Sequence, residues 1–160
     1  MKTIELGGKV MVSDPCYGMN VWCHGIVENV LPGTYNCSVV YSNEGAWGVR
    51  VAEIEVLHQD AKRYTMSHSG FVVGVDSGQA GIFDYEYYEH YHQRGVDDDW
   101  YDRVCAITLS AESAGTIDDS GFVSMSGFGD GGYDCYLYKD LNYNVVGFRI
   151  VYIYEDEEED

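Results

Sequence analysis

Apolar and polar residues alternate over several short stretches of the chain, which is the pattern expected of half-buried β-strands. In the stretch from Thr34 to Tyr41, every second residue from Tyr35 to Val39 is apolar, and a comparable pattern continues from Ala46 to His58. The residues between the two stretches, Ser42-Asn43-Glu44-Gly45, are typical of a turn. We therefore predict a β-hairpin from Thr34 to His58.

Shorter apolar runs bounded by glycine, proline or aspartate predict further strands. These runs are Lys9–Ser13, Phe71–Val75, Ala80–Phe83, Phe122–Ser126, Tyr133–Tyr138 and Val145–Tyr154. We expect the second and third runs to pair with each other, and the last two to form a hairpin. The stretch from Cys16 to Val30 lacks a clear pattern and is predicted to be irregular.

Between Asp84 and Leu109 the apolar residues change to helical spacing, and the only glycine there is Gly95. One apolar stripe consists of Tyr87, Tyr88 and Tyr91, and another of Trp100, Val104 and Ile107. The cluster Asp97-Asp98-Asp99 precedes the second stripe, and carboxylates favour a helix start because they cap free amides and oppose the helix dipole. Two short helices with a break near Gly95 are predicted.

Together these patterns predict an α+β fold, a β-rich single domain of antiparallel strands with one short helical segment. The 15 Tyr, 5 Phe and 3 Trp, and the 19 Gly with only 2 Pro, agree with a protein dominated by sheet. A length of 160 residues suits one domain. We assign the globular domain to residues 1–154 and an acidic tail to residues 155–160.

The chain has 27 acidic and 9 basic residues, which gives a net charge of −18. Direct nucleic-acid binding is not expected, because phosphate contacts need clustered cations and the longest basic run is Lys62-Arg63. Binding to a membrane is disfavoured for the same reason, and no window reaches about 18 uninterrupted apolar residues. The five scattered cysteines and the lack of an apolar signal core predict reduced thiols in a cytoplasm.

Neither a nucleotide-binding motif nor a catalytic pair is recognisable in the sequence. Gly127 to Gly132 matches the string G-x-G-x-x-G, but strand-like residues follow it instead of a helix, so a tight β-connection is the better interpretation. Cys16 has the least core-like setting of the cysteines, yet no local spacing marks a nucleophile with its base or a pair of catalytic carboxylates. We therefore assign no catalytic residue and expect no enzyme activity.

The candidate metal ligands also lack the required spacing. Cys16, Cys23 and His24 do not form a zinc motif, and His90 and His92 should point to different sides of the predicted helix. The acidic clusters at 97–99, at 118–119 and at 130 do not follow the calcium-binding EF-hand pattern, and cap or turn roles explain them. We expect no metal and no cofactor.

Five segments occur in a characteristic order: Ser13–Tyr17 (Ser-Asp-Pro-Cys-Tyr), Pro32–Tyr35, Trp47–Ala52, Gly74–Gly81 and Ser126–Tyr133. In this respect the chain, from Gly8 to Ile153, resembles a family of bacterial and bacteriophage proteins grouped as a domain of unknown function (DUF4241-like), whose members end in a Gly-Asp-Gly-x-Tyr hairpin. The resemblance implies a compact β-rich fold and an origin in phage or mobile-element genomes. It brings no activity, substrate or catalytic residue with it.

Charge and tyrosine content favour a non-enzymatic acidic binding protein that inhibits a host protein by occupying its basic surface. Such a host protein is expected to be a defence nuclease or another nucleic-acid-binding protein. The alternatives are a pocket protein that sequesters a small molecule or a cation, an undetected hydrolase, and a charge that serves only solubility. The residues expected to contact a partner or ligand are Asp76, Ser77, Gln79, Tyr87, Tyr88, Tyr91, Asp97, Asp98, Asp99, Asp130 and Tyr133.

Overall fold

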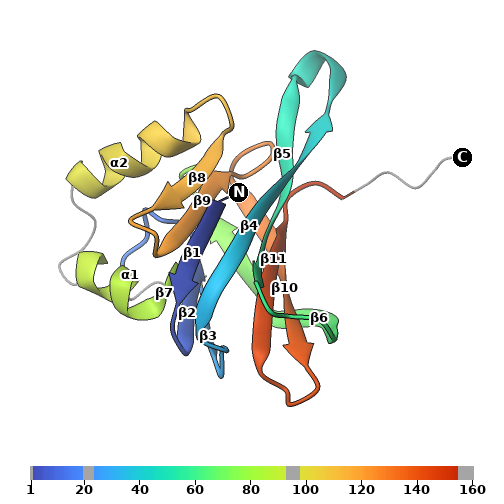
Figure 1. Cartoon of the computed structure of the whole chain (residues 1–160). Helices are drawn as coiled ribbons and strands as arrows, with labels where there is room; N and C mark the ends of the chain where they lie inside the picture. Colours follow the sequence, from blue (N-terminus) through green and yellow to red (C-terminus); the bar gives the residue numbers. More distant parts are fainter. Residues whose placement is uncertain (1, 20–23, 93–97, 155–160) are drawn as a thin grey trace, which may run out of the picture.

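The computed structural model describes residues 2–19, 24–92 and 98–154, which form two antiparallel sheets and two short α-helices (Figure 1). Sheet A contains, in spatial order, β1 (Lys2–Leu6), β4 (Gly33–Asn43), β5 (Val49–His58), β11 (Val145–Val151), β10 (Gly131–Asp140) and β6 (Tyr64–Val75). Sheet B contains β3 (Gly25–Glu28), β2 (Lys9–Ser13), β7 (Gln79–Asp84), β9 (Gly121–Met125) and β8 (Ala114–Ile117). The helices are α1 (Tyr85–His92) and α2 (Asp98–Thr108).

Sheet B is the middle layer of the molecule, between sheet A and the helices. Successive residues of a strand point to opposite faces. Val10, Val12 and Ile82 therefore lie in the core between the sheets, whereas Met11 and Phe83 pack against the helices. Because both faces of sheet B are covered at its centre, β2, β7 and β9 are buried almost continuously rather than at every second residue.

The predicted fold class is confirmed, and so are both predicted hairpins. β4 pairs with β5, and β10 pairs with β11, each in antiparallel register. A short 3-10 helix, η1 (Gly45–Trp47), closes the β4–β5 hairpin, whose tip projects beyond the rest of sheet A (Figure 1). Trp47 at this tip is 70% exposed.

The expected pairing of Phe71–Val75 with Ala80–Phe83 is wrong. The first run belongs to β6, an edge strand of sheet A, and the second belongs to β7 in sheet B. The turn between them passes from one sheet to the other. The main-chain N–H groups of Asp76 and Ser77 donate to the buried carboxylate of Asp14, so they do not close a hairpin.

The expectation of irregular structure from Cys16 to Val30 is also wrong in part, because this stretch contains β3. β3 pairs with β2, and its residues alternate between buried and exposed. Gly25 at its start is needed on steric grounds, since a Cβ atom there would lie 2.1 Å from the Phe71 ring. The strands β1 and β8 were not predicted; β1 carries a short alternating signal at Ile4 and Leu6, both of which are buried.

The predicted helical region forms α1 and α2, which cover the outer face of sheet B (Figure 1). Trp100 and Val104 are buried against this face, as their spacing indicated. The predicted break at Gly95 lies outside the described residues. Within residues 2–19, 24–92 and 98–154, neither helix is long and apolar enough to cross a membrane.

Candidate functional site

A buried aspartate, Asp14, joins the loop after β2 to the turn between β6 and β7. Its carboxylate accepts hydrogen bonds from the main-chain N–H groups of Cys16, Asp76 and Ser77, each at 2.8 Å, and from the Ser77 hydroxyl at 2.7 Å. A carboxylate inside a protein needs such donors, because burial removes its hydration. Ser77, expected at a binding surface, is therefore engaged in a structural contact.

The two helices hold the same loop through its main-chain carbonyl groups. The indole N–H of Trp100 donates to the carbonyl of Pro15 at 2.7 Å, and Nε2 of His92 lies 3.0 Å from the same oxygen. The Tyr88 hydroxyl donates to the Tyr17 carbonyl at 2.7 Å. Tyr88 was expected to contact a partner, but it is fully buried and its ring stacks on His92 at 3.8 Å, so it belongs to the core.

Gln79, another residue expected at a binding surface, is also buried. Its side-chain amide nitrogen lies 4.0 Å from Sγ of Cys16 and 3.8 Å from Sγ of Cys105, and its oxygen accepts the Thr108 hydroxyl at 2.6 Å. Burial raises the pKa of the Cys16 thiol to about 11, against the opposite effect of its hydrogen bond with Ser77. A thiol with such a pKa is protonated at neutral pH and is a weak nucleophile.

The glycine-rich segment Gly127–Gly132 leads from β9 of sheet B into β10 of sheet A, which begins at Gly131, so it is a β-connection as predicted. It is not a hairpin, because the two strands lie in different sheets. The main-chain N–H of Ser126 donates to the Gly78 carbonyl at 3.1 Å, which brings this segment beside the turn after β6. The tyrosine at its end, Tyr133, is half-buried and donates to the Gly129 carbonyl at 2.6 Å.

Three motif segments thus meet at one end of the two sheets, although they lie far apart in the sequence. They are Ser13–Cys16, Asp76–Gln79 and Ser126–Tyr133. Of the predicted site residues in this region, Asp76 and Asp130 are exposed. The remaining polar groups bond to one another, so these segments hold the sheets together rather than line an open site.

A second candidate lies on the helices. We define the helical surface as the exposed residues Glu86 and Glu89 of α1 and Asp98, Asp99, Tyr101 and Asp102 of α2. Asp98 and Asp99 were predicted, whereas the other four were not, although each occupies a position between apolar helix residues. Among the described residues, none of the five carboxylates has an ion-pair partner. The predicted Asp97 lies outside the described residues.

The two other predicted tyrosines of α1 are half-buried and lie beside a small charged network. The Tyr87 hydroxyl donates to Asp118 at 2.7 Å, and Arg103 of α2 forms an ion pair with the same carboxylate at 2.6 Å. Arg103 lowers the pKa of Asp118, and Tyr87 contributes to that shift. The Tyr91 ring stacks on Trp100 at 5.3 Å. These contacts fix the two helices against each other and leave both tyrosines only partly exposed.

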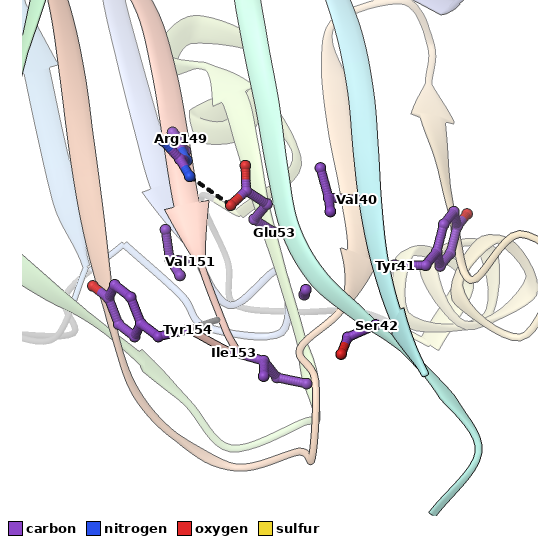
Figure 2. Close-up of a pocket in the computed structure, with 9 residues that line it drawn as sticks. Val40, Tyr41, Ser42, Glu53, Arg149, Val151, Ile153 and Tyr154 are labelled. Atoms are coloured by element: carbon purple, nitrogen blue, oxygen red, sulfur yellow. Dashed lines mark hydrogen bonds and ion pairs between the residues drawn. The ribbon is translucent and has the colours of Figure 1, made fainter. Parts of the chain in front are cut away.

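A groove of about 510 Å³ lies on the outer face of sheet A, beside the projecting β4–β5 hairpin. Figure 2 shows Val40 and Ser42 on one side of it and Val151, Ile153 and Tyr154 on the other. Arg149 and Glu53 form an ion pair at 2.7 Å in its wall (Figure 2). Because these two charges neutralise each other, the groove offers no free charge to a ligand of either sign.

Among the described residues, no group of three or more histidine, cysteine, aspartate or glutamate side chains is arranged to hold a metal ion. Comparison of the chain with protein-family models, with curated proteins and with solved structures gave no match. The functional conclusion therefore depends on the chemistry of the exposed surfaces.

Proposed function

We propose that the chain is a non-enzymatic binding protein whose helical surface docks on a basic surface of another protein. The observation that carries this proposal is the set of five exposed carboxylates on α1 and α2. The cation within the described part of these helices, Arg103, is already bound to Asp118. The described helical surface is therefore strongly negative.

Such a surface attracts a cationic partner before contact. Charges of one sign on one side of a molecule steer a partner of opposite charge and raise its association rate. At physiological ionic strength the Debye length is about 8 Å, so the attraction is strong only when the two protein surfaces are about that close. The rest of the chain, at a net charge of −18, adds to the long-range part of this attraction.

An aromatic side chain supports the same surface as an interface. Tyr101 is 47% exposed and lies on α2 three residues after Asp98 and one before Asp102. Residues three apart on a helix are neighbours, so the carboxylate of Asp98 lies on the same side of α2 as the ring. Tyrosine is enriched among residues that dominate binding energy, because it buries a large area at a small cost in side-chain entropy. Tyr101 thus replaces Tyr88 as the expected anchor.

The chemistry of the helical surface suggests a class of partner. Proteins that bind nucleic acids expose clustered lysine and arginine side chains, which neutralise phosphates. An acidic surface with an exposed aromatic ring competes for such a cluster. We therefore propose a nucleic-acid-binding protein as the partner, a class that includes the host defence nucleases expected from the sequence.

The hydrolase alternative has less support. The best placed thiol, Cys16, has a raised pKa, and its neighbour Gln79 already hydrogen-bonds to Thr108. The Asp14 carboxylate is bonded to four donors, and a general base needs a free lone pair directed at its substrate. The hydrogen bonds of Asp14 instead hold two of the motif segments together, and that of Gln79 joins one of them to α2.

Site-directed photo-crosslinking tests the proposal. Tyr101 is replaced by p-benzoylphenylalanine, and the full chain is exposed to a host-cell lysate; the same replacement at Trp47, exposed at the tip of the β4–β5 hairpin, is the control. Protein crosslinked at position 101 but not at 47 is identified and purified. Its association rate is then measured between 50 and 300 mM salt.

Two matched charge variants complete the experiment. One neutralises the five carboxylates of the helical surface to Gln or Asn, and the other neutralises five exposed carboxylates elsewhere, at Glu28, Asp60, Asp76, Asp119 and Asp130. Both lose the same charge, and circular dichroism confirms that both are folded. We expect the association rate to fall by about tenfold or more for the first variant and much less for the second. A rate that ignores salt, or equal losses in both variants, contradicts the proposal.

A further inference from the structure

The cations of this acidic chain divide into two groups. Arg94 lies outside the described residues, and five of the other eight have partners. Lys2 pairs with Glu112, Arg103 with Asp118 and Arg149 with Glu53, while Lys9 lies over the ring of Tyr85 and Arg50 over that of Phe128. The remaining three, Lys62, Arg63 and Lys139, have no ion-pair partner among the described residues, and all three line one hollow of about 530 Å³.

The sheet register brings these three cations together. Lys62 and Arg63 lie in the β5–β6 loop, directly before β6. Lys139 is opposite Thr65 in the antiparallel pair of β10 and β6, so it lies next to the end of that loop. The loop and the β10–β11 turn lie at the same end of sheet A, the lower end in Figure 1. This end consists of sheet A and the segment that follows β3, whereas the helical surface covers the opposite face of sheet B.

The aromatic rim of the hollow is held in place. Tyr143 has a positive φ of 64° and is 77% exposed. Its main-chain N–H donates to the Asp140 carbonyl at 3.0 Å, and its carbonyl accepts the side-chain amide of Asn29 at 3.0 Å. A left-handed backbone at a bulky residue costs free energy and persists only where neighbouring contacts impose it. The fold thus maintains a large exposed ring beside three cations.

The residues that line the hollow have a net positive charge, although one of them, Asp140, is acidic. The carboxylate of Asp140 accepts the main-chain N–H groups of Asn142 and Asn144 at 2.9 and 3.0 Å, which shapes the β10–β11 turn. It therefore serves the turn and offsets only one of the three positive charges. Tyr64, whose ring packs at a tilt against that of Tyr138 with 5.1 Å between the ring centres, adds a second aromatic ring to the lining.

We propose that this hollow binds a nucleotide, with its phosphates on Lys62, Arg63 and Lys139 and its base against Tyr143. Lysine and arginine are the side chains that bind phosphate oxygens through charge-assisted hydrogen bonds. A planar base stacks on an exposed tyrosine ring, which explains why the rim is aromatic rather than polar. The site is distinct from the helical surface, so it adds a small-molecule ligand to the proposed function.

Isothermal titration of the full chain at 150 mM salt tests this site with four ligands: ATP, adenosine, inorganic triphosphate and hexaglutamate. The hollow variant replaces Lys62, Arg63 and Lys139 with Gln. A matched control replaces Lys2, Lys9 and Arg50 with Gln, which changes the net charge equally at other places. Tyr143→Leu removes the ring and keeps an apolar side chain. Circular dichroism and melting temperatures establish that each variant is folded.

We expect saturable binding of ATP that weakens about tenfold or more in the hollow variant and in Tyr143→Leu, and little in the matched control. Adenosine and triphosphate should each bind more weakly than ATP. Adenosine lacks the phosphates that the three cations would bind, and triphosphate lacks the base that would stack on Tyr143. Absence of ATP binding at millimolar concentration overturns the proposal. Equal losses in the hollow variant and the control, or binding of triphosphate or hexaglutamate as tight as that of ATP, overturn it as well.

Discussion

The carboxylate of Asp14 holds Ser77 at two points, by its main-chain N–H at 2.8 Å and by its hydroxyl at 2.7 Å. Asp14 follows β2 of sheet B, and Ser77 lies in the turn where the chain passes from sheet A to sheet B. This contact therefore ties the two sheets together at the end where the three motif segments meet. Its strength follows from the burial of the charge and the number of its donors.

The substitution Asp14→Asn should be strongly destabilising. Asparagine has the same shape, but its NH₂ group would face N–H and O–H donors and leave buried groups unpaired. We expect a loss of about 3 kcal/mol or more in the free energy of unfolding, measured by urea denaturation. Asp76→Asn is the control, because that carboxylate is exposed and should change stability by less than about 0.5 kcal/mol. Equal effects of the two substitutions would argue against the role of Asp14.

Gly81 in β7 should not tolerate a side chain. A Cβ atom there would lie 2.8 Å from the main-chain oxygen of Phe122 and 2.6 Å from the Phe83 ring. Since β7 is paired on both sides, the backbone cannot move away easily. We expect Gly81→Ala to lower the free energy of unfolding, measured by urea denaturation, by about 1–3 kcal/mol. Gly18→Ala, where nothing lies within 4 Å, should have little effect, and a comparable loss there would contradict this explanation.

The stabilisation from Asp118 should disappear at low pH. Arg103, and after it Tyr87, lower the pKa of Asp118 in the folded protein. Folding then favours the ionised carboxylate, so the contribution is complete above the unfolded-state pKa near 3.8 and is lost as the pH falls through the folded-state value. The side chain is 40% exposed, which limits the contribution to that of a surface ion pair, below about 1 kcal/mol.

The measurement compares the urea stability of the wild type with that of Asp118→Asn across pH. We expect a small, constant difference between pH 8 and 5 that shrinks toward pH 2. A difference that grows on acidification would contradict a lowered pKa of Asp118 in the folded protein.

The thiol of Cys16 should react slowly in the folded protein. Burial raises its pKa from 9.0 to about 11, so the thiolate fraction at pH 8 should fall roughly a hundredfold. Iodoacetamide labelling, resolved by peptide mass spectrometry, should modify Cys16 far more slowly in buffer than in urea. Fast labelling of the native protein at neutral pH would reveal an activated thiol and favour the hydrolase alternative.

The sequence by itself determined the elements in which the local pattern and the final environment agree. Alternation from Thr34 to His58 predicted the first hairpin because one face of sheet A lies against the core and the other is exposed. Helical spacing predicted α1 and α2, since each buries one stripe on sheet B. Of the five carboxylates of the helical surface, the sequence predicted only those of Asp98 and Asp99 as contact residues.

Only the tertiary structure decided which segments meet. β6 and β7 are adjacent in the chain yet belong to different sheets, because the donors of their connecting turn bind the distant Asp14 carboxylate. Tyr88 has the same residue type as Tyr87, but one helical step of about 100° places it in the core. Lys139 joins Lys62 and Arg63 only through the register of β10 with β6. Each of these outcomes depends on long-range contacts, which local spacing does not contain.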